Sequence, residues 1–312
     1  MGMNWGAGIL IGAAVMAGSV GCAEAQMGGR AAAENEQQVT EVPFRWVKSQ
    51  RMIEVSIKGQ GPFAFLVDTG VSGAAVDLDL ASRLGIELPK ERESKMDAGA
   101  MAGRRIYQTW ITDLSVGGLH LDRLQAAALS LEPLSQRLGE PLHGILGDGF
   151  LKTRVTRFDD AGQTLSFASS LEAFDGDVAV ADYVTPMVIS PGGEMPILEV
   201  TLGGKSFVAT LDMGSSLGLE IFTPFIDEFG LSHAPQEWKE GKVLGGSLGQ
   251  ATVYDGVLKR IDIGPLTFTD VPTSITPPRS DPQRKGNLGN QLWEGYVLIL
   301  DFVDHRIVFR KP

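Results

Sequence analysis

The strongest constraint on the fold is an internal repeat that extends over most of the chain. Residues Phe65–Gly70 read FLVDTG, and residues Val208–Ser215 read VATLDMGS. In both segments an apolar run with β-strand character delivers an aspartate, Asp68 or Asp212, to a glycine-containing turn, and the two aspartates are 144 residues apart. Self-similarity at a long period indicates a duplicated structural unit.

Further landmarks recur in the same order on both sides of the chain. Alternating apolar and polar residues at Met52–Gly59 and Ile197–Gly204 predict a half-buried strand before each aspartate. After each aspartate, Leu78–Gly85 and Thr223–Gly230 have the capping residues of short helices.

Each half then has a glycine-rich tip between strands, which we interpret as a flap over a binding site. The candidate flap residues are Gly99, Met101 and Gly103 in the first half, and Gly246 and Ser247 in the second.

The last repeated block is Gly144–Leu151, which matches Gly286–Trp293, and each copy leads into a closing hairpin. Four of these landmarks, namely the strands, the aspartates, the helix-ending glycines and the last block, lie 142 to 145 residues apart. We therefore expect two homologous lobes. The predicted organisation is a signal peptide at 1–25, a flexible lead at 26–39, an N-terminal lobe at 40–172, a linker at 173–184 and a C-terminal lobe at 185–312.

Two carboxylates brought face to face by such a duplication have a defined chemistry. Within about 3 Å both cannot ionise, because like charges disfavour each other, so the pair shares one proton and titrates as a unit. The charged member can activate a water as a general base, and the protonated member can stabilise the oxyanion that forms on a carbonyl. Gly70 and Gly214 would let backbone amides approach the two carboxylates.

These motifs resemble the pepsin/retropepsin-like aspartic proteases, and most closely their bacterial periplasmic single-chain branch. The resemblance implies an all-β bilobal fold of two β-barrel-like lobes with the active site in the cleft between them. It implies Asp68 and Asp212 as catalytic residues acting on an extended peptide or protein substrate, without a cofactor, in a monomer. It also implies a supporting role around the acids for a further set, namely Thr69, Gly70, Gly214, Ser215, Gly147 and Gly289.

The sequence departs from the family pattern near both acids. Met213 replaces the hydroxyl residue that should follow the second acid, so only Thr69 can brace the two loops. Val71 lacks the hydroxyl that Ser215 provides in the second lobe, which favours Asp68 as the acid and Asp212 as the base. Asn287 interrupts the second hydrophobic-hydrophobic-glycine motif. The alternative interpretation is a weak or inactive homologue that binds peptides or a protein partner.

The N-terminus has the features of an export signal. Trp5–Val20 is apolar and uncharged, and Ala23–Ala25 fits a small-x-small cleavage site, although no Lys or Arg precedes the run. We therefore expect a periplasmic or secreted protein. Cys22, the only cysteine, allows the alternative of an outer-membrane lipoprotein, and a membrane contact is expected only if Cys22 is lipidated.

Other function classes fit the sequence less well. A net charge of −11 argues against nucleic acid as a partner. Gly245–Gly249 matches the serine-hydrolase elbow, but a β-prone segment follows where a helix is required. The four histidines lack metal-ligand spacing, so no metal site is expected.

Overall fold

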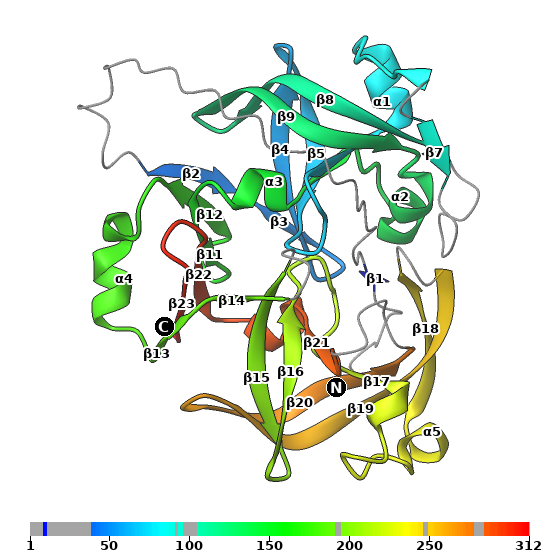
Figure 1. Ribbon diagram of the computed structural model, residues 1–312, viewed down its shortest axis with the longest axis vertical. Helices are drawn as coiled ribbons and strands as arrows, with labels where there is room; N and C mark the ends of the chain where they lie inside the picture. Colours follow the sequence, from blue (N-terminus) through cyan, green and yellow to red (C-terminus); the bar gives the residue numbers. More distant parts are fainter. Residues whose placement is uncertain are drawn as a thin grey trace.

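The computed structural model describes residues 9–10, 39–90, 93–95, 105–190, 195–245, 249–277 and 284–311. It confirms the all-β, two-lobed architecture predicted from the sequence. One lobe lies at the top of Figure 1 and the other at the bottom, and a third sheet lies beside their junction. The candidate flap residues Gly99, Met101, Gly103, Gly246 and Ser247 and the lipidation candidate Cys22 lie outside the described residues.

The N-terminal lobe is built on a sheet whose order, within the described ranges, is β3-β4-β5-β10-β6-β9-β8-β7. Strand β10 is parallel to β5 on one side and antiparallel to β6 on the other, so it lies between the strands that flank the first Asp-x-Gly turn. The strands are β3 (Arg45–Val47), β4 (Gln50–Ile57), β5 (Gln60–Val67), β6 (Ala74–Asp77), β7 (Glu93–Lys95), β8 (Arg105–Val116), β9 (Leu119–Leu129) and β10 (Gly144–Leu146).

The C-terminal lobe repeats this arrangement and has β1 as an additional strand at one edge. Its order is β1-β18-β19-β20-β17-β21-β16-β15-β14, and β21 lies between β16 and β17 as β10 lies between β5 and β6. The strands are β1 (Ile9–Leu10), β14 (Val188–Ile189), β15 (Pro196–Leu202), β16 (Lys205–Leu211), β17 (Leu219–Phe222), β18 (Lys239–Gly245), β19 (Gly249–Ile263), β20 (Leu266–Thr276) and β21 (Gly286–Leu288).

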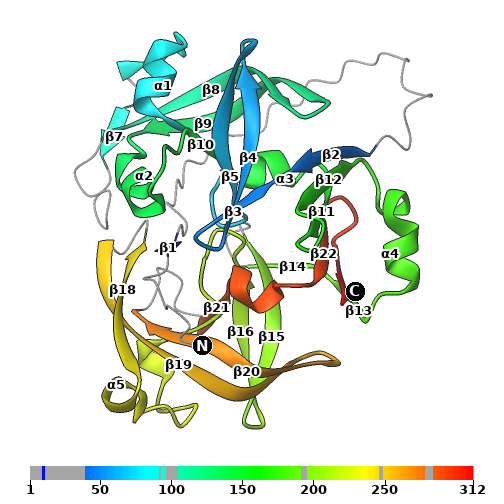
Figure 2. The same cartoon turned by 180° about the vertical axis from the view of Figure 1, so that it is seen from behind.

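The closing hairpins of the two lobes meet in one sheet of order β13-β23-β22-β11-β12-β2. Figure 2 shows this sheet beside the junction of the lobes. Strands β11 and β22 pair antiparallel from Val155↔Asp301 to Asp159↔Val297. The strands are β2 (Thr40–Pro43), β11 (Val155–Asp159), β12 (Thr164–Ala168), β13 (Tyr183–Pro186), β22 (Val297–Asp301) and β23 (Arg306–Arg310).

Short helices connect the strands. They are α1 (Leu78–Arg83), α2 (Glu132–Leu138), α3 (Asp148–Leu151), α4 (Asp175–Ala179) and α5 (Ala234–Glu237), with 3-10 turns η2 (Leu171–Phe174), η3 (Thr223–Phe225) and η4 (Asn290–Trp293). The helix expected at Leu78–Gly85 is α1. The prediction of a helix at Thr223–Gly230 is wrong, because only the 3-10 turn η3 forms there. Hydrogen bonds such as that from Ile226 N to Thr223 O close shorter turns than those of an α-helix.

The main hydrophobic core passes through both lobes and the shared sheet. It includes Val55 and Ile111 from the first lobe, Val200 and Ile261 from the second, and Phe158 from β11, all of them buried. Among the described residues, no helix is both long enough and apolar enough to cross a membrane.

Candidate active site

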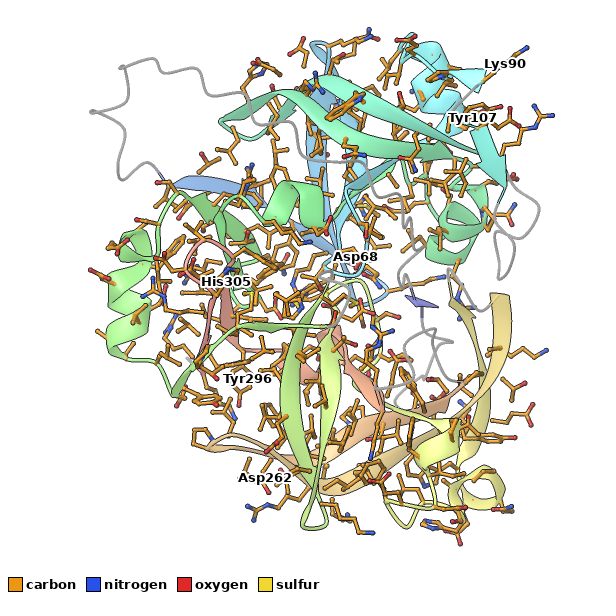
Figure 3. All side chains as sticks on the ribbon, in the orientation of Figure 1. Asp68, Lys90, Tyr107, Asp262, Tyr296 and His305 are labelled. Carbon is orange, nitrogen blue, oxygen red and sulfur yellow. The ribbon has the colours of Figure 1, made fainter. Side chains whose placement is uncertain are left out.

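Strand β5 carries Asp68 to the junction of the lobes. The backbone amide of Asp68 donates to the Leu146 carbonyl on β10 at 3.0 Å, which continues the parallel pairing of β5 and β10 past the end of the strand. The carboxylate is fully buried and accepts a bond from the Gly70 amide at 2.6 Å. Figure 3 shows Asp68 near the centre of the molecule, where the upper and lower lobes meet.

Strand β16 places Asp212 in the same way. Its amide donates to the Leu288 carbonyl on β21 at 3.0 Å, and its carboxylate, also fully buried, accepts from the Gly214 amide at 3.0 Å. The equivalent backbone hydrogen bonds in both lobes show that the two repeated segments also share the same backbone geometry.

The two Asp-x-Gly turns are in direct contact. A Cβ atom built on Gly214 would lie 2.0 Å from the Asp68 Cγ, so the Asp68 carboxyl group packs against the backbone of the opposite turn. The Thr69 hydroxyl donates to the Leu211 carbonyl at 2.8 Å and accepts from the Met213 amide at 3.0 Å. Thr69 therefore braces the loops from one side, as the sequence predicted.

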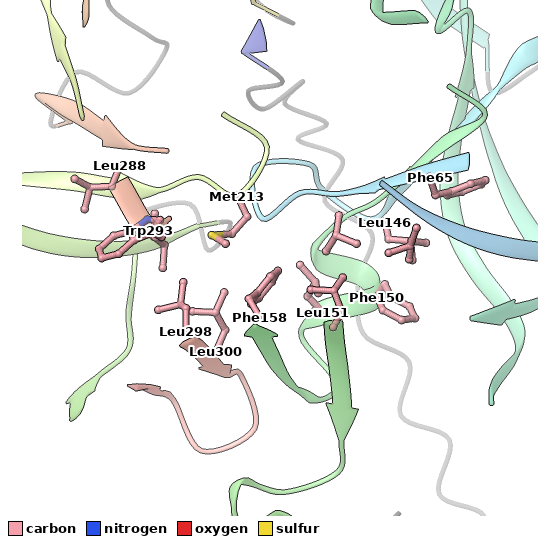
Figure 4. Close-up of a cluster of buried hydrophobic side chains, with 14 of the residues drawn as sticks. Phe65, Leu146, Phe150, Leu151, Phe158, Met213, Leu288, Trp293, Leu298 and Leu300 are labelled. Carbon is pink, nitrogen blue, oxygen red and sulfur yellow. The ribbon is translucent and has the colours of Figure 1, made fainter. Parts of the chain in front are cut away.

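Met213 places its side chain in the apolar core. It is fully buried. Figure 4 shows it within a cluster that includes Phe158, Trp293 and Leu300, so the side chain links the second turn to the shared sheet. Apolar contact thus occupies the space of the missing hydroxyl.

The glycines expected to support the turns are sterically required. A Cβ on Gly147 would lie 2.0 Å from the Val71 carbonyl oxygen, and one on Gly289 would lie 2.4 Å from the Leu217 carbonyl oxygen. Strands β10 and β21 therefore approach the loops as closely as their backbones allow.

The structure gives Ser215 a different partner from the one expected. Its hydroxyl donates to the Glu220 carboxylate at 2.9 Å and accepts from the Leu217 amide at 3.3 Å. Asn287 is a side chain that donates to Asp212, with its Nδ2 2.8 Å from Asp212 Oδ2. Asn287, treated in the sequence as a flaw in a motif, is therefore a part of the site that sequence reasoning missed.

The two lobes differ at three register-paired positions on neighbouring strands close to the two aspartates. In the N-terminal lobe the row across β5, β10 and β6 is apolar, and consists of Leu66, Ile145 and Ala75. The corresponding row in the C-terminal lobe is polar and fully or almost fully buried, and consists of Thr210, Asn287 and Glu220. Aligning the repeats residue by residue would have revealed this difference.

A second group of buried polar side chains, contributed by both lobes, holds the second turn. Gln50 Nε2 donates to the Gly214 carbonyl at 2.6 Å, and Asn290 Nδ2 donates to the Met213 carbonyl at 3.0 Å. Arg51 donates to Asn290 Oδ1 at 2.5 Å and to both oxygens of Asp160 at 2.8 Å. Burial raises the pKa of Asp160 and lowers the pKa of Arg51, so this ion pair is strongly desolvated.

The site can therefore perform acid–base chemistry. Within the described part of the chain, no group of three His, Cys, Asp or Glu side chains could hold a metal ion. What the arrangement offers is two aspartates on facing turns, each held by a backbone amide. Such an arrangement can activate a water and polarise a carbonyl.

Comparison with known proteins agrees with this geometry. A family model described as aspartyl protease matches residues 53–150 and 198–292, more than half of the chain and one segment in each lobe. The chain belongs to the aspartyl protease family. Both segments of the aspartyl protease match contain an Asp-x-Gly turn, Asp68 in the first and Asp212 in the second.

Two further similarities are weaker. The chain resembles the solved structure of basic 7S globulin from soybean with a TM-score of 0.50 and 11% identity, over 88% of this chain and 94% of that chain, which shows the fold alone. It is 27% identical over 165 residues to the 33 kDa chaperonin of Synechococcus sp. (strain JA-3-3Ab). That match covers 50% of this chain and 51% of the relative, so the chain spans about half the length of this curated relative.

Proposed function

We propose that this protein is an aspartic endopeptidase that hydrolyses extended peptide or protein substrates. The observation that carries the proposal is the contact of the two Asp-x-Gly turns, with the Asp68 carboxyl group against Gly214 and the Asp212 carboxylate held by Gly214 and Asn287. Asp212 acts as the base on a water, and Asp68 donates a proton to the scissile carbonyl. No cofactor takes part in this scheme.

Met213 is the specific observation behind the alternative, a homologue that binds peptides without cutting them. The one-sided brace through Thr69 and the packing of Met213 into the core argue for an intact site. We therefore prefer the enzyme.

The test is incubation of the chain from Gln26 onward with a diverse peptide mixture between about pH 3 and pH 8, a range that covers the titration of a carboxyl pair. Products are identified by mass spectrometry beside Asp68→Asn and Asp212→Asn. Cleavage that both variants abolish supports the proposal. A folded parent that binds peptides but cuts none would favour the alternative.

We also propose that the protein is exported, on the strength of residues 1–25, and that it is a monomer, because one chain supplies both lobes. The check is the mass of the mature N-terminus recovered from a bacterial host. A start at Gln26 supports signal-peptide removal, a lipid-modified Cys22 supports the lipoprotein alternative, and an intact Met1 in the cytoplasm would contradict export.

A further inference from the structure

Three consecutive hydrogen bonds form a chain that ends on the Asp212 carboxylate. Arg284 Nη1 donates to Thr210 Oγ1 at 3.3 Å, the Thr210 hydroxyl donates to Asn287 Oδ1, and Asn287 Nδ2 donates to Asp212 Oδ2 at 2.8 Å. All four side chains are buried, with Arg284 at 7% the most exposed.

Chemistry fixes the direction of this chain. A guanidinium has only donors, so the Thr210 oxygen must accept from Arg284 and use its single hydrogen elsewhere. Of its two acceptors, Asn287 Oδ1 is much nearer than the Gly286 carbonyl at 3.5 Å, so the hydrogen goes to Asn287 and the amide nitrogen of Asn287 faces Asp212. Every bond therefore runs from the cation to the carboxylate.

Such a chain favours a charged acceptor. Hydrogen bonds in series polarise one another, most strongly away from water, and donation to a carboxylate stabilises its ionised form. The positive charge of Arg284 thus acts on Asp212 through two neutral side chains.

The equivalent positions of the N-terminal lobe cannot form this chain of hydrogen bonds. Leu66 and Ile145 occupy the positions of Thr210 and Asn287, and both are apolar. The difference between the lobes lies in side chains, since the strands and their register are the same, and it therefore distinguishes Asp212 from Asp68.

We propose that Arg284, Thr210 and Asn287 are positioning residues that keep Asp212 ionised and so assign the base role to Asp212. This inference rests on the proposed peptidase function and specifies how its two acids divide their tasks.

Other charged groups lie close to this series of hydrogen bonds. Asp68 packs against the second turn, and Glu220 on β17 accepts from Asn287 Nδ2 at 3.4 Å, from Ser215 Oγ at 2.9 Å and from Thr276 Oγ1 at 3.4 Å. The Arg51–Asp160 pair reaches the same turn from the opposite side, through Asn290. The amide of Asn287 lies between Glu220 and Asp212 and donates to both, which reduces the repulsion of two carboxylates.

The first test is Thr210→Val, which keeps the shape of the side chain and removes the hydroxyl link. We expect the acidic limb of the kcat/KM profile to move upward by about 0.7 pH unit, the equivalent of one hydrogen bond, with little change on the plateau. Asn287→Leu should move the limb further. Thr156→Val, the same change at a fully buried threonine on β11, should leave the limb in place.

A uniform loss of activity with an unmoved acidic limb would show that Thr210 has only a structural role, and would overturn the inference. If the folded parent cleaves nothing, the proposed function fails first. The inference is then tested by carbon-13 NMR titration of the Asp212 carboxyl, assigned with Asp212→Asn. An upward shift of its midpoint in Thr210→Val supports the donor chain, and an unchanged midpoint overturns it.

Discussion

At the level of single residues, the site divides into what local motifs predict and what only the fold reveals. Asp68 and Asp212 are recognisable because each lies between an apolar strand and a glycine-containing turn. Asn287 is not, because its partners Asp212 and Glu220 are 75 and 67 residues away along the chain. A polar residue in a buried strand looks like an unfavourable substitution in the motif until its hydrogen-bond partners are known.

The contact between the turns predicts a severe effect of Gly214→Ala. The new methyl group would overlap the Asp68 carboxyl group and push it aside. A displacement of about 1 Å costs roughly 100-fold in rate, so we expect a loss of at least about that size in kcat/KM. Gly176→Ala, where a Cβ meets nothing within 4 Å, is the control. Full activity of folded Gly214→Ala would contradict the observed contact.

The burial of Met213 predicts that Met213→Thr lowers the stability of the protein. Threonine leaves a cavity beside Phe158 and Trp293 and buries a hydroxyl, so the free energy of unfolding should fall by about 2 kcal/mol. Activity should stay within about fivefold, because Thr69 already braces the loops and one net hydrogen bond is worth about 1 kcal/mol. Urea denaturation measures the first and peptide cleavage the second. Met213→Leu, which conserves volume, is the control. An unchanged or higher stability of Met213→Thr would contradict the packing.

At the level of elements, the periodicity of the sequence predicts the strands well. Met52–Gly59 and Ile197–Gly204 contribute to β4 and β15, and both closing hairpins form. The expected helix at Thr223–Gly230 fails because capping residues cannot compensate for a short segment that contains phenylalanines, which are weak helix formers. Its turns are closed instead by bonds between residues three apart.

One element of the site should respond to acid. His143 Nδ1 accepts from the Ala64 amide on β5 at 3.1 Å, so protonation of the ring removes an anchor of the strand that carries Asp68. Burial, followed by the charge of Arg83, lowers the pKa of His143 below its usual 6.5. The folded state therefore prefers the neutral ring, and this contribution is complete above about pH 6.5 and lost as the pH falls through the folded value.

His143→Asn tests this response, because Asn Oδ1 can accept the same bond at any pH. Between about pH 7 and pH 5, the parent should lose about 1 kcal/mol more unfolding free energy than His143→Asn, measured by urea denaturation. His305→Asn, at an exposed position with positive φ that asparagine tolerates, should behave as the parent does. Equal losses in the parent and His143→Asn would exclude the role of His143.

At the level of the whole molecule, the sequence predicts two lobes but not how they are joined. The structure buries Asp160 against Arg51, whose guanidinium lies 4.6 Å from the centre of the Trp46 ring and bonds to Asn290 of the other lobe. These contacts join positions up to 239 residues apart, which no local pattern can reveal.

The Arg51–Asp160 pair should therefore be essential to stability as a pair. Arg51→Met leaves Asp160 buried without its cation, and should lower the free energy of unfolding by about 3 to 5 kcal/mol. The double variant with Asp160→Leu should recover most of this loss, because it removes the stranded charge. Arg45→Met, at the exposed pair with Glu140, should cost less than about 1 kcal/mol. A single variant no worse than the double would contradict this account.

The shared sheet also determines how two fragments of a cleaved chain would associate. Cutting between η2 and β13 would leave the N-terminal fragment with the edge of β11 exposed, where five residues now pair with β22. An exposed strand edge is a template for another chain. The two fragments should thus reassemble by complementation. Because the hairpins that meet there are repeats of one another, an N-terminal fragment alone should pair with a second copy of itself through β11.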